Sequence, residues 1–124
     1  MTEPEYFHKY LIKKFSPPYF KDMYHGFSRN ILISAIVIQP VEIIDNGNIS
    51  CGCMILYYGV DNYQTKPNSF LFESFYCSLD EAYEDMLNDF GLSQDDFVYM
   101  VENEINQFEY LNNDRTKPTT PRTH

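Results

Sequence analysis

The chain has 124 residues, of which 44% are hydrophobic, and its formal net charge at pH 7 is −9. This length fits one domain with enough apolar side chains to form a core. The negative charge disfavours direct binding to nucleic acid or to an anionic membrane, because both are polyanions, and it favours a basic protein partner.

Cysteine usage and the N-terminal residues indicate the compartment. Cys51, Cys53 and Cys77 are an odd number of cysteines, whereas a disulfide framework in a chain this short usually needs four or more. Residues 1–5 are acidic and polar, unlike a signal peptide. The apolar run 31–38 is far too short to span a bilayer. We therefore expect a cytoplasmic protein with reduced thiols.

The N-terminal region predicts a pair of helices. Thr2 and Glu5 match a capping box, and apolar residues recur at helical spacing as far as Phe15. Pro17 and Pro18 would end this helix. A shorter aromatic helix over residues 19–25 would follow it.

The period of the apolar residues changes at the next segment. Residues 31–38 are β-branched and apolar on both faces, which predicts a central strand covered on both sides. Pro40 should bend this strand or divide it in two, because proline cannot donate to a strand ladder.

A hairpin and a further strand follow. Asn46-Gly47 predicts a two-residue type I′ turn. Residues 49–58 form the return strand, in which Gly52 predicts a bulge or a close backbone approach. Residues 70–76 alternate in character and predict another strand.

Two helices are expected after the sheet. Ser78 with Glu81 forms a second capping box before an amphipathic pattern that ends at Gly91, the expected left-handed cap. Ser93 would open another helix, with Phe97, Val98, Val101, Ile105 and Phe108 on its buried face. The short connection between them predicts a helix hairpin.

The predicted fold class is therefore α+β, in the order ααβββ(β)αα. It has a small, mostly antiparallel sheet of three to four strands, an N-terminal helix pair and a C-terminal acidic helix hairpin. Residues 1–111 form the single domain. Residues 112–124 are predicted to be a disordered polar tail, because they lack the apolar side chains that would offset the entropy of ordering.

Acidic residues concentrate in the C-terminal part of the chain. Residues 67–114 hold twelve Asp and Glu side chains and no Lys or Arg. On the first predicted acidic helix, pairs such as Asp80 and Glu84 carry like charges four residues apart, and each pair costs about 0.2–0.5 kcal/mol. A solvated helix face normally mixes signs, so this pattern favours a docking surface for a basic partner, although an ordinary solvated face in an acidic protein is the alternative.

Two tyrosines, Tyr99 and Tyr110, are interleaved with the carboxylates of the second acidic helix and are either binding anchors or the edge of the core. The candidate partner-binding residues are Asp80, Glu81, Glu84, Asp85, Asp89, Asp95, Asp96, Tyr99, Glu102 and Tyr110. If Lys9, Lys13, Lys14 or Arg29 paired with these carboxylates, the surface would be internal to the fold and unavailable to a partner.

The sequence contains no pattern that specifies a reaction. It has no Cys-x-x-Cys, no His-x-x-x-His, no calcium-loop pattern and no glycine-rich phosphate loop. We predict no catalytic residue, no cofactor and no metal site. Cys53 or Cys77 could pair with His25 as a nucleophile, but buried inert thiols are commoner on an apolar strand.

The main functional hypothesis is a small acidic inhibitor, not an enzyme. It would bind and neutralise a basic protein such as a nuclease toxin, as an immunity protein, or a defence nuclease, as an anti-defence DNA mimic. One alternative is a small enzyme or ligand-binding domain with its pocket between the N-terminal aromatic helices and the sheet. Another is a structural subunit that forms a homodimer.

Overall fold

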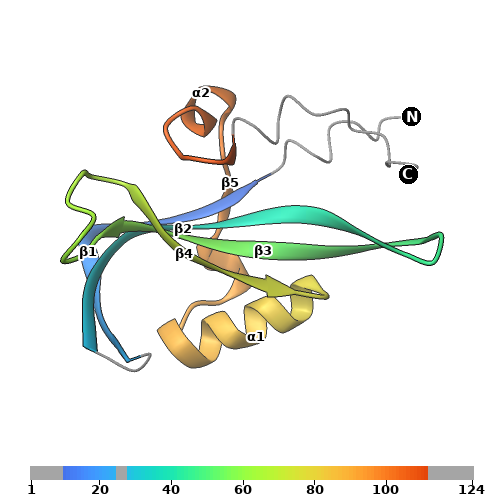
Figure 1. The fold of residues 1–124 in the computed structure, drawn as a ribbon, viewed down its shortest axis with the longest axis horizontal. Helices are drawn as coiled ribbons and strands as arrows, with labels where there is room; N and C mark the ends of the chain where they lie inside the picture. Colours follow the sequence, from blue (N-terminus) through green and yellow to red (C-terminus); the bar gives the residue numbers. More distant parts are fainter. Residues whose placement is uncertain (1–9, 25–27, 112–124) are drawn as a thin grey trace.

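The structure, a computed structural model, describes residues 10–24 and 28–111. They form a five-stranded antiparallel sheet with the strand order β4-β3-β2-β1-β5. Its elements are β1 (Leu11–Tyr24), β2 (Ser28–Asp45), β3 (Asn48–Val60), β4 (Ser69–Tyr76), α1 (Leu79–Phe90), the 3₁₀ turn η2 (Gln94–Asp96), β5 (Val98–Tyr99) and α2 (Glu102–Ile105). Figure 1 shows α1 and α2 on opposite sides of this sheet.

The predicted fold class is wrong in two of its features. No N-terminal helix pair forms in the described residues, because Leu11–Tyr24 is strand β1. The predicted C-terminal helix hairpin is also absent: α1 forms, but η2, β5 and the four-residue α2 replace its second helix. The sheet has five strands instead of three or four. Residues 1–9 and the predicted tail 112–124 lie outside the described residues.

Strand β1 forms because, as a strand, this segment buries apolar side chains on both faces of the sheet. Tyr10 and Ile12 are buried on one face, and Leu11 and Phe15 pack into the core of the other face. Leu11 and Phe15 are four residues apart, a spacing that suits a helix face but also places both on one face of a strand. Ten residues of β1 pair with β2, from Leu11 opposite Ile38 to Tyr24 opposite Ser28.

The two prolines expected to end a helix instead form a bulge in β1. The register against β2 shifts between Lys14 and Tyr19, and the Ser16–Pro17 peptide bond is cis. A bulge is one of the few places where a sheet accepts proline, because an unpaired residue needs no N–H donor. Pro17 and Pro18 are therefore exposed without a loss of ladder hydrogen bonds.

Strand β2 is the predicted central strand, and its burial on both faces is confirmed. Ile31, Ile33, Ile36 and Ile38 belong to the core beneath α1. Ala35 and Val37 belong to a second core on the opposite face. The change from odd to even numbers on one face follows from the bulge at residue 34, where the register against β3 also shifts.

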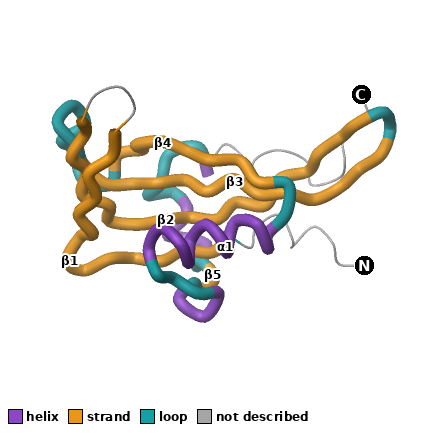
Figure 2. Tube along the Cα trace, turned by 90° about the horizontal axis from the view of Figure 1, so that it is seen from below, coloured by secondary structure: helices purple, strands orange, loops and turns teal. Residues whose placement is uncertain are grey.

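The β2–β3 hairpin extends beyond the strands on either side of it (Figures 1 and 2). β1 pairs with β2 only as far as Ile38, and β4 pairs with β3 only from Cys53 onward. We call residues 39–52 the arm. Pro40 was predicted to bend or divide β2, but β2 runs from Ser28 to Asp45 without a break. Pro40 lies beyond the end of β1, where no described strand pairs with that edge of β2.

The turn at the tip of the arm confirms the predicted hairpin. Asn46 and Gly47 have φ angles of 52° and 83°, which is the left-handed region required at both central positions of a type I′ turn.

The predicted amphipathic helix α1 is also confirmed. The Ser78 hydroxyl accepts a hydrogen bond from the Glu81 N–H at 3.2 Å, and Gly91 ends the helix with a φ of 70°. Ala82 and Met86 are buried against the sheet. The β1–β2 hairpin bends toward the side of the sheet on which α1 lies (Figure 1), and at the C-terminal end of α1 the rings of Tyr19 and Phe90 meet with centroids 5.2 Å apart.

After α1 the chain crosses the edge of the sheet through β5. Phe97 belongs to the core beneath α1, whereas Met100, Ile105, Phe108 and Leu111 belong to the core on the opposite face. The Met100 N–H donates to the Tyr10 carbonyl at 2.8 Å, and the Tyr58 hydroxyl donates to the Glu109 carbonyl. The apolar face predicted for a single helix is thus divided between two cores, and two of its members, Val98 and Val101, are exposed.

Neither helix in the described part of the chain is long and apolar enough to cross a membrane.

The bulge predicted as one possibility at Gly52 does not form, because pairing there is regular; a close backbone approach occurs at Gly59. A Cβ on Gly59 would lie 2.0 Å from the Leu32 carbonyl oxygen, beside the register shift between β2 and β3. At this point the two backbones are too close for any side chain.

We predict that Gly59→Ala lowers the free energy of unfolding by at least about 3 kcal/mol, because main-chain atoms of β2 would have to move. Gly91→Ala is the matched control, since its Cβ would meet open space and would cost only about 1–2 kcal/mol for the left-handed conformation. Urea denaturation of both variants measures the difference. Equal losses would contradict the close approach at Gly59.

Candidate protein-binding surface

The outer face of α1 carries five carboxylates, as the sequence predicted. Asp80, Glu81, Glu84 and Asp89 are exposed. Asp85 is partly buried, and its carboxylate accepts a hydrogen bond from the Tyr76 hydroxyl at 2.6 Å. Burial, followed by this hydrogen bond, raises the pKa of Tyr76 to about 12. Asp85 is therefore tied to β4, and the other four carboxylates face solvent.

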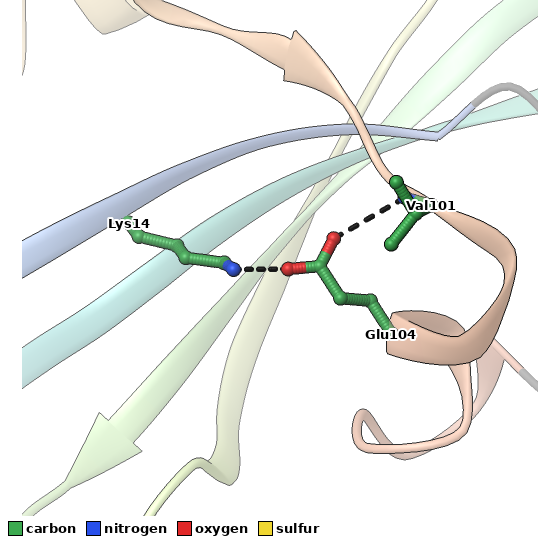
Figure 3. Close-up of polar contacts among 3 residues, drawn as sticks. All are labelled: Lys14, Val101 and Glu104. Atoms are coloured by element: carbon green, nitrogen blue, oxygen red, sulfur yellow. Dashed lines mark hydrogen bonds and ion pairs between the residues drawn. The ribbon is translucent and has the colours of Figure 1, made fainter.

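One anticipated neutralisation does occur, but on the other side of the sheet. Lys14 of β1 forms an ion pair with Glu104 of α2 (Figure 3). The second carboxylate oxygen of Glu104 accepts from the Val101 N–H at 3.2 Å. The hydrogen bond from Lys14 is the main cause that lowers the pKa of Glu104. This carboxylate is part of the fold and is not available to a partner.

Other lysines lie close to the C-terminal end of α1 and to the turn η2. The Lys21 ammonium lies 3.4 Å from the Asp89 carbonyl oxygen and 4.9 Å from the centroid of the Phe90 ring. A cation there complements the negative end of the helix dipole. Lys13 and Lys14 line one cleft together with Asp96, whose carboxylate also accepts from the Ser93 N–H at 2.8 Å.

The least compensated charges are therefore Asp80, Glu81 and Glu84, in the N-terminal half of α1. No described Lys or Arg side chain forms an ion pair with any of these three carboxylates, and Lys9 and the Arg29 side chain lie outside the described part. Asp95, on η2, is also exposed.

The remaining candidate residues do not share one surface. Tyr99 on β5 pairs with Leu11, so it projects on the face covered by α1. Tyr110 lies on the opposite face, where its ring packs edge-on against Phe70 with centroids 4.8 Å apart. Glu102 begins α2 on that opposite face, and its side chain is outside the described part. The single acidic surface expected from the sequence is thus split by the sheet.

A groove that the sequence did not predict adjoins the acidic end of α1. It has a volume of about 170 Å³ and lies between the base of the arm, the start of α1 and strand β5. Its walls include Leu11, Ile38, Pro40, Cys51, Leu79 and Tyr99. The only sequence signal for it was the pair Cys51 and Cys53, which alternation places on one face of β3, the face that lines this groove.

The three thiols differ in exposure. Cys51 and Cys77 are exposed, and Cys53 is buried. Burial, with a smaller contribution from Glu81, raises the pKa of Cys53 to about 11. The Cys53 thiol lies 3.9 Å from the Ser78 carbonyl oxygen. His25, the partner considered for a cysteine nucleophile, lies outside the described residues.

No group of three or more His, Cys, Asp or Glu side chains among the described residues is arranged to hold a metal ion. Comparisons with protein-family models, with curated proteins and with solved structures found no match.

We predict that Glu104→Gln lowers the free energy of unfolding by about 0.2–1 kcal/mol at pH 7, because it removes the ion pair with Lys14. The pKa of Glu104 is lowered in the folded state, so this stabilisation is present above its ordinary value of 4.5 and is lost as pH falls through the folded-state pKa. Denaturation at pH 7 and at pH 3 measures the loss. A difference from wild type that persists undiminished at pH 3 would contradict the assignment.

A thiol reagent at neutral pH should modify Cys51 and Cys77 rapidly and Cys53 at least about 100-fold more slowly. The thiolate is the reacting species, and a pKa raised from 9.0 to about 11 leaves about 100-fold less of it. Mass spectrometry of timed samples identifies the labelled residues, and the denatured protein, in which all three should react alike, is the control. Rapid labelling of Cys53 would instead favour a reactive thiol.

Proposed function

We propose that the protein is a small acidic inhibitor that binds and neutralises a basic protein partner such as a nuclease. The partner would be a nuclease toxin, for which this chain is the immunity protein, or a defence nuclease, for which it is a DNA mimic. One observation carries the proposal. Asp80, Glu81 and Glu84 are exposed and form no ion pair with any described side chain, and Asp80 and Glu81 directly follow Leu79, which lines an apolar groove at the start of α1.

The spacing of charge along α1 supports a partner that otherwise binds nucleic acid. The helix from Asp80 to Asp89 is about 14 Å long and four of its carboxylates face solvent, which is roughly one per 3.5 Å. One strand of DNA carries a phosphate per roughly 3.4 Å of helix axis. Lysines and arginines that bind phosphates at this spacing could bind the carboxylates instead. Their approach would also relieve the repulsion between Asp80 and Glu84.

The enzyme alternative loses the pocket on which it was based. Its pocket was expected between N-terminal helices and the sheet, but residues 11–24 form strand β1, so a pocket of that kind does not arise there. The homodimer alternative stays a prediction.

A DNA-cleavage assay with a panel of purified basic nucleases tests the proposal. Wild-type protein should inhibit at least one nuclease, and the inhibition should weaken with added salt. Asp80→Lys/Glu84→Lys should raise the concentration needed for half inhibition by about 100-fold, because repulsion replaces attraction at the interface. No inhibition of any nuclease would remove the inhibitor function.

The matched control is Glu73→Lys/Glu109→Lys. Both residues are exposed and lie on or beside the face of the sheet opposite α1. Each double variant moves the formal net charge from −9 to −5, since every reversal adds two charges. The control should inhibit nearly as well as wild type, and circular dichroism should show both variants folded. An equal loss in both would show that net charge matters and the α1 surface does not.

A further inference from the structure

We propose that the groove between the arm and α1 receives one bulky apolar side chain of the basic partner, and that Asp80 and Glu81 bind lysine or arginine residues beside it. This inference rests on the proposed function and specifies the partner's binding segment. The segment would present a single apolar anchor, such as phenylalanine or leucine, flanked by basic residues.

The size of the groove sets the size of the anchor. Its volume is about 170 Å³. An apolar cavity of about 150 Å³ accommodates one benzene molecule. The groove therefore has room for one aromatic or branched aliphatic side chain, and an entire apolar helix face would not fit.

The walls of the groove leave apolar area exposed at the position where an anchor would bury it. Leu79 belongs to the apolar pattern of α1, yet it is 41% exposed at the start of the helix. Tyr99, on the opposite wall, is 63% exposed. Ile49 continues the apolar surface along the arm and is 50% exposed. Ile49 lies two residues before Cys51 on β3. Because strand residues two apart share a face, Ile49 projects on the face of the arm that lines the groove.

Charge around the groove selects the residues that flank the anchor. Asp80 and Glu81 directly follow the groove residue Leu79 on α1. Glu42 is the cross-strand partner of Cys51, so its side chain projects on the same face of the arm. The described side chains that line the groove include no Lys or Arg.

The same charges argue against a second copy of the chain as the occupant. Two copies meeting at this groove would bring Glu42, Asp80 and Glu81 of one copy close to the same carboxylates of the other. Like charges facing each other across an interface are unfavourable. A basic segment from a different protein has the complementary charge.

The arm forms one wall of the groove, and no described strand pairs with either of its edges beyond Ile38 and Cys53. Among the described strands, residues 41–52 pair only with each other, and an isolated two-stranded hairpin is marginally stable in water. An anchor seated between the arm and α1 would add packing to the arm where β1 and β4 do not reach. We therefore expect the arm to exchange its amide hydrogens more slowly when the groove is filled.

Two short synthetic peptides test the inference. Both are rich in lysine, and they differ only in a central residue, which is phenylalanine in one and serine in the other. Wild-type protein should bind the phenylalanine peptide at least about 10-fold more tightly, because the ring is removed from water in the groove. Fluorescence anisotropy measures both affinities.

Cys51→Trp should abolish this preference by filling the groove, while the salt-dependent binding of both peptides remains. The matched control is Ser50→Trp, which adds the same ring to the opposite face of the arm because successive strand residues alternate. It should keep the preference. In a Cys77→Ser background, the phenylalanine peptide should also slow labelling of Cys51 and slow amide exchange in residues 39–52.

The outcomes separate this inference from the proposed function. Asp80→Lys/Glu84→Lys should lower the affinity of the protein for both peptides, and unchanged affinities would count against the acidic surface itself. If the charge variant weakens both peptides but wild type binds them equally, only the anchor inference fails. A dimer in sedimentation that Cys51→Trp dissociates would assign the groove to a second copy. Slow labelling of Cys51 without peptide would show that another part of this chain fills the groove. Either result would overturn the anchor.

Discussion

The two-sided burial of β2 is the constraint on which the rest of the structure depends. Its residues 31–38 are apolar on both faces, so each face of the sheet needs a cover to exclude water. The described residues include one long helix, α1, and it covers one face. The other face is covered by residues 100–111, which reach it by passing around the β1 edge through β5. The C-terminal third cannot form a helix hairpin while it covers two opposite faces.

This crossing also decides which carboxylates can act together. It carries Glu104 to the face where Lys14 projects, and that charge becomes part of the fold. It places Tyr110 against Phe70, away from α1. The carboxylates on α1 remain on the other side, and Lys21 approaches only the C-terminal end of the helix. On α1, the charge that remains uncompensated therefore lies toward the start of the helix, where Leu79 lines the groove.

A surface of this kind divides the work of binding between two effects. Exposed carboxylates accelerate the encounter with a basic partner, and salt weakens this attraction. Each surface ion pair contributes little affinity. An apolar anchor buried in a groove contributes affinity and specificity, because it fits only where the walls match. The start of α1 brings both together, with Leu79 in the wall and Asp80 at the rim. Cys53 lies beneath this site as a buried thiol whose raised pKa suits a structural role.

The sequence by itself determined the features that depend on neighbouring residues: the type I′ turn at Asn46-Gly47, the capped helix α1 with its acidic face, and the two-sided strand β2. The tertiary structure decided the features that depend on distant residues. Residues 10–24 carry a spacing that fits a helix or a strand equally, and pairing with β2 selected the strand. The apolar residues from Phe97 to Leu111 show no sign in sequence of serving two cores. The groove exists only because the arm, α1 and β5 meet in space. Local hydrogen bonds and turn geometry can be inferred from a few adjacent residues, whereas the burial of apolar surface is settled by the whole fold.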